Sequence, residues 1–257
     1  MEYIVLLSDG KSNPNLLGGK GLNLIKLIEA GINVPPGFVI NINAYENFLK
    51  ETENTDKLNE ILSITLEPKK IMQVSADIQD LILKSEIPKE IIDEIKVAYD
   101  QTCEITGDEV YFAVRSSATV EDSSKFSFAG QADSFLYNKS FDDILNSLKK
   151  CWASLYSPRA LLYLLQMRKK GFDLSLKDVR MAVVVQKMIN SEISGVLFTA
   201  NIVTNNESQM YLNSTWGLGD PIADNSINPD TIILNKDKFE VIKIIMTNQS
   251  HTDRSYR

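Results

Sequence analysis

Cysteine, histidine and long apolar runs are all scarce in this chain, and each scarcity excludes a class of protein. The only cysteines, Cys103 and Cys151, fit no metal-ligand spacing, and the only histidine is His251. Two distant cysteines argue against a disulfide scaffold, so we expect a reduced, cytoplasmic protein. No apolar run approaches the length that spans a bilayer, and the N-terminal segment is too short and acidic for a signal peptide. We therefore expect no membrane partner.

An excess of positive charge is also missing. The formal net charge is −7, from 27 lysine and arginine residues against 34 aspartate and glutamate residues. Nonspecific binding to nucleic acid requires a basic face, so this balance argues against nucleic acid as a partner. An anionic ligand would have to be held by local cations rather than by the field of the whole protein.

What is present is enough apolar sequence for a large core. The chain has 257 residues, of which 44% are hydrophobic, and its length suits one large domain or two lobes. Helical periodicity dominates the first half, where residues 56–106 predict two or three helices interrupted at Pro88. Strand patterns dominate the second half, and the apolar run Met181–Val185 predicts a strand buried on both faces. This order predicts an α+β protein.

Helix ends can be placed from capping residues. The helix that follows Gly18 is predicted to stop at Gly31, a residue that suits a helix C-terminus. Asn43 with Glu46, and Ser140 with Asp143, each resemble a capping box at the start of a helix.

The stretch from Tyr111 to Ser134 is the most distinctive in the chain. A short apolar strand, Tyr111–Val114, is predicted to deliver Arg115 into a loop rich in serine, threonine and glycine. A guanidinium group grips phosphate oxygens in pairs, and backbone N–H groups can close around the rest, so this pattern suits a polyanion. We expect the segment Thr119–Phe128 to act as a lid over phosphates. The alternative is an ordinary surface hairpin loop.

A second candidate anion site lies at the start of the first helix. Gly18, Gly19 and Lys20 are predicted to begin that helix, where unpaired N–H groups and the helix dipole favour an anion. The segment is not a P-loop, because Gly21 follows the lysine where Ser or Thr is required. The alternative for Lys20 is a solvated surface lysine.

Five segments together resemble a known family. They are LGGKGLNL from Leu17, AVRSSATVED from Ala113, FAGQADSFL from Phe128, VVVQKMINSEISGVLFT from Val183 and NSTWGLGDPIADNSINPD from Asn213. This ordered set resembles the nucleotide-binding module of the phosphoenolpyruvate synthase, pyruvate phosphate dikinase and rifampicin phosphotransferase family. The resemblance implies an ATP-grasp fold of two lobes: residues 1–185, with the helical segment 56–106, and residues 186–257, a second lobe that we expect to be incomplete at its C-terminus.

The resemblance also implies a set of ligand-binding residues. Lys20 and Arg115 match the two phosphate-gripping cations of the family, to which it assigns the catalytic role. Gly130 and Ser134 match positions that line the nucleotide. Gln186, and the backbone of Lys187, Met188 and Ile189, would face the adenine. These eight assignments come from the family pattern and not from spacing or composition.

The activity that the resemblance implies is that of a dikinase. ATP would give AMP and phosphate, and the β-phosphate would pass to a carrier histidine on a separate domain and then to pyruvate or an antibiotic hydroxyl. The implied cofactors are ATP and Mg²⁺, whose family ligands we expect beyond the end of this chain. The implied partners are a phosphohistidine carrier domain and an acceptor-substrate domain, in cis downstream or in trans. His251 lacks the sequence context of the family's carrier.

Two other interpretations stay open at this point. The chain could be a non-catalytic nucleotide-binding or regulatory module that keeps Lys20 and Arg115 for binding alone. It could also be an inactive truncated fragment.

Overall fold

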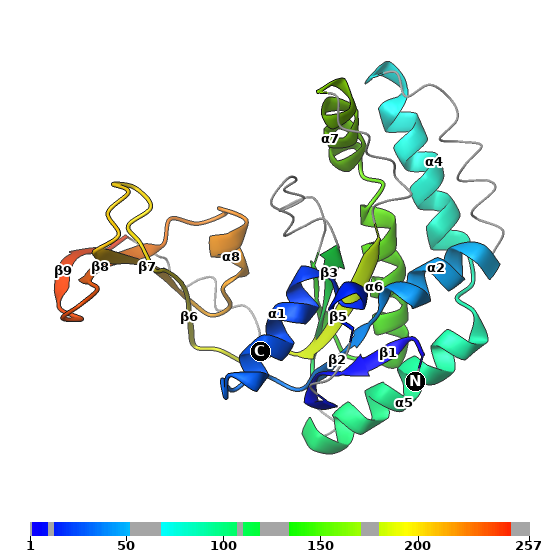
Figure 1. Cartoon of the computed structure of the whole chain (residues 1–257), viewed down its shortest axis with the longest axis horizontal. Helices are drawn as coiled ribbons and strands as arrows, with labels where there is room; N and C mark the ends of the chain where they lie inside the picture. Colours follow the sequence, from blue (N-terminus) through cyan, green and yellow to red (C-terminus); the bar gives the residue numbers. More distant parts are fainter. Residues whose placement is uncertain are drawn as a thin grey trace. The chain divides into compact units, whose positions relative to one another are not determined.

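The computed structural model describes residues 2–9, 13–51, 68–106, 110–118, 134–170 and 180–247. The chain divides into two compact units, Met1–Met188 and Ile189–Arg257. Each unit contains one antiparallel sheet and is described by itself (Figure 1).

The first unit is organised around a five-stranded sheet in the order β1-β2-β5-β3-β4. Its strands are β1 (Ile4–Leu6), β2 (Gly37–Ile40), β3 (Phe112–Ala118), β4 (Ser134–Asn138) and β5 (Met181–Lys187). All neighbouring pairs are antiparallel. Strand β5 comes last in the chain among these five strands but lies at the centre of the sheet, and its first five residues are 0% exposed. This confirms the buried strand that the run Met181–Val185 predicts.

Helices cover both faces of this sheet. The helices of the first unit are α1 (Gly18–Glu29), α2 (Ile42–Glu51), α4 (Ile71–Lys84), α5 (Lys89–Thr106), α6 (Phe141–Ser154) and α7 (Pro158–Lys169), with short 3₁₀ helices at Leu7–Asp9, Pro14–Leu16 and Pro68–Lys70. One face of the sheet packs against α4, α5, α6 and α7, and together they form the larger core. Most of the buried residues of α2 also belong to this core. On the other face, Val39 and Val184 pack with Leu17 and Ile25 of the α1 segment in a smaller core.

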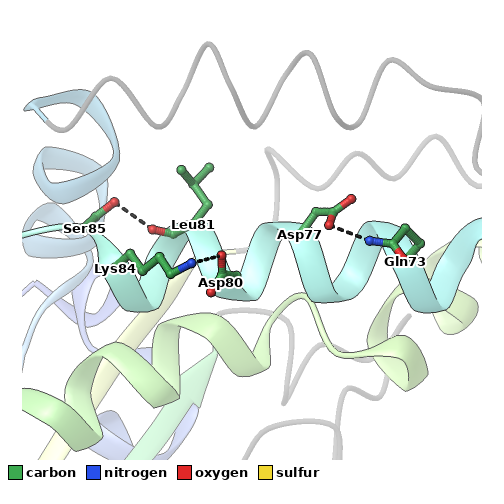
Figure 2. A network of polar contacts seen from close by, with 6 residues as sticks. All are labelled: Gln73, Asp77, Asp80, Leu81, Lys84 and Ser85. Atoms are coloured by element: carbon green, nitrogen blue, oxygen red, sulfur yellow. Dashed lines mark hydrogen bonds and ion pairs between the residues drawn. The ribbon is translucent and has the colours of Figure 1, made fainter.

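The long helices follow their apolar periodicity. On α4 the side chains of Ile71, Val74, Ile78 and Ile82 are buried. The exposed side of α4 carries polar contacts, including Lys84 to Asp80 at 2.7 Å and Gln73 to Asp77 at 2.7 Å (Figure 2). Burying an isoleucine is worth roughly 1.5–3 kcal/mol, so the apolar side dominates the energetics of these helices. Pro88 separates α4 from α5, as predicted.

Two of the predicted helix starts can be compared directly with the structure. Ser140 and Asp143 form the predicted capping box at the start of α6. The box predicted at Asn43 is wrong, because α2 begins at Ile42 and the side chain of Asn41 accepts the hydrogen bond from Asn43 N–H at 2.9 Å. Asn41 therefore caps this helix, since its oxygen pairs with one of the N–H groups left unpaired in the first turn.

The second unit contains a four-stranded antiparallel meander in the order β6-β7-β8-β9. Its elements are β6 (Ile193–Phe198), β7 (Gln209–Trp216), the short helix α8 (Asp220–Ala223), β8 (Asp230–Asn235) and β9 (Val241–Ile245). The turn between β8 and β9 is closed by Asn235, whose side chain accepts from the N–H groups of Asp237 and Lys238. Helices concentrated in the first unit and a separate strand-rich unit confirm the α+β prediction.

Candidate functional site

Arg115 lies in the middle of strand β3, not after its end. The predicted strand Tyr111–Val114 is too short, because β3 continues to Ala118. Arg115 is paired with Ser134 on β4 and with Val184 on β5. Paired residues of neighbouring antiparallel strands project to the same face of a sheet. The side chains of Arg115 and Ser134 are therefore on the face that carries α1.

Gln186 is on this same face, two residues beyond Val184 on β5. It is 7% exposed, and its side-chain amide donates to Pro35 O at 3.1 Å. The register thus brings together three of the predicted residues, Arg115, Ser134 and Gln186, from three adjacent strands. Sequence alone could not show this, because it depends on the strand order.

Lys20 is in the first turn of α1, and Ser117 fixes this turn against β3. The Ser117 hydroxyl donates to Leu17 O at 2.9 Å and accepts from Gly21 N–H at 3.1 Å. Gly18 has φ +64°, and a Cβ built there would lie 2.0 Å from Ser117 O, so only glycine allows this close approach. Ser117 is two residues after Arg115 on β3 and contacts the turn that contains Lys20. The start of α1 with Lys20 therefore lies next to the part of β3 that carries Arg115.

The start of α1 has the electrostatic character of an anion site. Its N-cap residue, Leu17, makes no side-chain capping hydrogen bond, and its first turn carries no acidic residue. Lys20 adds a full positive charge to the partial charge of the helix N-terminus. The side chains of Lys20 and Arg115 are both half-buried.

The segment predicted to face adenine continues the sheet at the end of β5. Lys187 N–H donates to Pro36 O at 2.9 Å, and Met188 N–H donates to Tyr111 O at 2.8 Å. Ile189 is 54% exposed, and its carbonyl accepts from Ser191 N–H at 2.9 Å. Two of the N–H groups in this segment are therefore used within the first unit, where they hold the end of the strand in place.

Sequence reasoning missed two tyrosines beside this segment. The rings of Tyr111 and Tyr137 meet edge to face, with centroids 5.9 Å apart and planes 75° apart. Tyr137 N–H donates to Met188 Sδ at 3.1 Å. One sequence signal could have found the tyrosines: each is close to a predicted phosphate contact. Tyr111 directly precedes β3, which carries Arg115, and Tyr137 follows Ser134 on β4.

Several predicted features cannot be placed. Gly130, the expected lid Thr119–Phe128 and His251 lie outside the described residues. Within the described ranges, no three His, Cys, Asp or Glu side chains gather into a group that could hold a metal ion. In the same part of the chain, no helix is both long and apolar enough to cross a membrane.

Comparison with known proteins gives a family. Residues 14–256 match the model described as "Pyruvate phosphate dikinase, AMP/ATP-binding domain". The match covers nearly all of the chain, so the chain belongs to this family of ATP-binding domains, and the expected ATP-grasp class of fold is confirmed.

Three archaeal proteins are among the curated relatives of the chain. A probable phosphoenolpyruvate synthase of Archaeoglobus fulgidus is 42% identical over 248 residues, covering 95% of this chain and 32% of that protein. The probable phosphoenolpyruvate synthase of Methanocaldococcus jannaschii is 39% identical over 246 residues, covering 94% of this chain and 20% of that protein. The corresponding protein of Pyrococcus horikoshii is 40% identical over 266 residues, covering 90% and 32%. The chain thus spans between a fifth and a third of the length of these relatives.

Proposed function

We propose that this chain is the ATP-binding module of a dikinase-type phosphotransferase of the phosphoenolpyruvate synthase kind. The observation that carries the proposal is the shared face of the first sheet, where Arg115, Ser134 and Gln186 are aligned by register beside the helix start that holds Lys20. The names of the relatives support the choice of reaction.

In this proposal the two cations act on the phosphates. Lys20 and Arg115 neutralise the charge of the triphosphate, and the Ser134 hydroxyl donates to a phosphate oxygen. Gly130 would allow a close approach of the backbone. Transfer of a phosphoryl group needs positioning and charge neutralisation more than covalent help from the protein. We assign the catalytic contribution of this chain to these two side chains.

Recognition of the base falls to the end of β5. Because Lys187 and Met188 donate their N–H groups within the sheet, we assign them a positioning role. The Gln186 side chain and the peptide of Ile189 then supply polar contacts to the adenine edge, with Met188 beneath them. A rigid strand end suits this task because it holds donors and acceptors in a fixed line.

In this proposal magnesium is held through the phosphates of the nucleotide. The described residues offer no cluster of ligands for it, so we derive no catalytic step through a protein-held metal. Mg²⁺ is usually held by one or two carboxylates together with substrate phosphates. The carrier histidine domain and the acceptor-substrate domain, for pyruvate or another acceptor, complete the proposed reaction as partners.

The proposal is tested by calorimetry with ATP. Arg115→Ala removes one charged hydrogen-bonding group, worth roughly 1.5–3 kcal/mol, and should raise the Kd for ATP about 10- to 150-fold. The matched control is Arg180→Ala in the same unit, which removes an exposed ion pair with Glu46 at 3.0 Å and should leave the Kd unchanged. Equal ATP affinity of the wild type and Arg115→Ala would contradict the proposal.

A further inference from the structure

Two adjacent serines on β3, Ser116 and Ser117, are equally buried but differ in their contacts. Both are 0% exposed. Ser116 pairs with Val183 on the side of the larger core, and Ser117 pairs with Ala182 on the side that carries α1. The Ser116 hydroxyl has no hydrogen-bond partner among the described residues, whereas the Ser117 hydroxyl makes two hydrogen bonds. Burial on this strand does not by itself require a hydroxyl, so the contacts of Ser117 need a separate explanation.

The Ser117 hydroxyl takes part in the first hydrogen bond of α1. In a regular helix the N–H of a residue donates to the carbonyl four residues earlier, so Gly21 N–H would donate to Leu17 O. Here the hydroxyl accepts from Gly21 N–H at 3.1 Å and donates to Leu17 O at 2.9 Å. It therefore bridges this donor and this acceptor from a strand that is 96 residues away from Gly21 in the chain. A side chain that enters this hydrogen-bond pattern changes the local path of a helix, so the geometry of the first turn depends on Ser117.

The same turn is packed tightly against two strands. A Cβ built at Gly18 would lie 2.0 Å from Ser117 O and 2.5 Å from Ser117 Oγ. A Cβ built at Gly21 would lie 3.3 Å from Cγ2 of Val39 on β2. The first turn of α1 is therefore held close to the backbone of β3 and to the side chains of β2, with little room to move toward the sheet.

Ser117 joins the two segments that carry the predicted cations. Lys20 lies between Gly18 and Gly21 in the turn that the hydroxyl holds, and Arg115 lies two residues before Ser117 on the same face of β3. A serine hydroxyl has one hydrogen, and in Ser117 it is donated to Leu17 O, so no donor is left for a phosphate oxygen. Ser117 can therefore affect a bound phosphate only through the groups that it holds.

We propose that Ser117 is a positioning residue of the phosphate site. Its buried hydroxyl fixes the first turn of α1, and with it Lys20, at a set place relative to Arg115. This inference rests on the proposed ATP-binding function, in which both cations contact the triphosphate. Two cations neutralise one polyanion well only when their spacing matches it, and a misplacement of about 1 Å can cost a large factor. Loss of the hydroxyl should therefore weaken phosphate binding although both cations remain.

The test compares Ser117→Ala with Ser116→Ala by calorimetry with ATP and with tripolyphosphate, on the 257-residue chain. Ser117→Ala should raise the Kd of both ligands by the same factor, about 3- to 10-fold, which is less than the loss expected when a charged group itself is removed. Ser116→Ala removes the same atom from an equally buried residue of the same strand, but it breaks no hydrogen bond among the described residues. This control should leave both Kd values unchanged.

A double-mutant cycle with Lys20→Ala separates positioning from a general loss of structure. If Ser117 acts through the position of Lys20, its effect should largely disappear once the lysine side chain is gone. In the Lys20→Ala background, Ser117→Ala should therefore raise the Kd for ATP by less than about 2-fold. If tryptophan fluorescence shows that Ser117→Ala does not fold, Ser117→Cys takes its place in both experiments. A thiol has nearly the size of the hydroxyl but is a weaker donor and acceptor, so the same direction of change is expected with a smaller factor.

The outcomes separate this inference from the proposed function. If wild type binds neither ATP nor tripolyphosphate, the proposed function itself fails. If wild type binds both ligands and the Ser117 variant binds them equally well, the positioning role is overturned. The role is also overturned if Ser116→Ala loses as much affinity as Ser117→Ala, or if the effects of the Ser117 and Lys20 changes simply multiply.

Discussion

The two sheets of this protein differ most in how their strands are covered. In the first unit, each residue of β5 from Met181 to Val185 is 0% exposed. In the second unit, every residue of β9 is exposed, and Val241 and Ile244 are each 54% exposed. Helices pack on both faces of the first sheet, whereas α8 is the one helix that the structure describes in the second unit.

This difference shows where positional precision can come from. Arg115, Ser134 and Gln186 all lie on strands of the first sheet, so the packed core fixes their backbone positions. Sites built on rigid elements hold their geometry better than sites on loops. A unit with few buried apolar contacts opens more easily, and we therefore expect lower local stability in the second unit.

The largest expected effect comes from truncating a core phenylalanine. Phe38 is 0% exposed and Phe239 is 73% exposed, so the two residues form a matched pair across the units. Phe38→Ala should lower the free energy of unfolding of the first unit by roughly 3–5 kcal/mol, because it leaves a cavity. Phe239→Ala should change stability by no more than about 0.5 kcal/mol.

Tryptophan fluorescence can follow this experiment unit by unit. Trp152 is buried in the first unit and Trp216 is in the second. In a Trp216→Phe background, guanidinium unfolding followed by fluorescence reports on the first unit and measures Phe38→Ala, and in a Trp152→Phe background it reports on the second unit and measures Phe239→Ala. Similar losses for the two phenylalanine variants would show that the contrast in burial has no energetic meaning.

A smaller effect is expected where a glycine is crowded. Gly18→Ala combines φ +64° with a Cβ only 2.0 Å from Ser117 O, and should destabilise the first unit by roughly 2–4 kcal/mol. Gly217 in the second unit has φ +76° with nothing within 4 Å of a built Cβ. Gly217→Ala should therefore cost only the conformational strain, about 1 kcal/mol. Thermal unfolding of both variants measures the difference, and an equal shift would show that the helix start is not clamped.

A buried hydroxyl pair gives the smallest effect of the three. Tyr45 and Tyr156 are both buried, with hydroxyl oxygens 2.6 Å apart. Tyr45→Phe leaves the other hydroxyl unpaired in the core and should cost roughly 1–3 kcal/mol, while the double Phe variant should cost less than twice as much. Thr231→Val, which removes a 3.0 Å bond to Asn213 in the second unit, should cost about 1 kcal/mol. Strict additivity of the two tyrosine changes in denaturant unfolding would argue against coupling within the pair.

The same pair predicts a loss of stability at alkaline pH. Burial raises the pKa of Tyr156 to about 12, and burial with the neighbouring Tyr156 raises the pKa of Tyr45 well above its ordinary value of 10.0. Because the folded pKa values exceed the unfolded ones, the pair stabilises the fold below pH 10 and loses this contribution as pH rises through 12. The double Phe variant should show a shallower decline of stability from pH 10 to 12 than wild type.

Much of the local structure followed from the sequence. The core strand at Met181, the helix break at Pro88 and the Ser140 capping box all depend on neighbouring residues, and all three are confirmed. The cap of α2 was misassigned because Asn41 and Asn43 are chemically alike, and only the backbone conformation selects between them. The length of β3 was underestimated because Ser116 and Ser117 look like loop residues but are buried in the sheet.

The candidate site shows where sequence reasoning stops. The family motifs identify Lys20 and Arg115 separately. Their common location depends on Ser117, whose hydroxyl forms hydrogen bonds between β3 and the start of α1. Tyr137 was missed because nothing in its neighbours reveals a bulge or a positive φ. The shared location of Lys20 and Arg115 and the conformation of Tyr137 both depend on contacts between segments far apart in the chain. Periodicity and propensity do not encode such contacts.

The central place of β5 has a consequence for how the protein is made. Val39 on β2 pairs with Val184 on β5, so these two strands cannot pair until most of the first unit has left the ribosome. Closing such long loops is slow, because the entropy of ordering the intervening chain is lost before the new contacts form. During that interval β1, β2 and α1 expose apolar surface that chaperones can bind. The meander of the second unit, which pairs strands adjacent in the sequence, can form soon after it is synthesised.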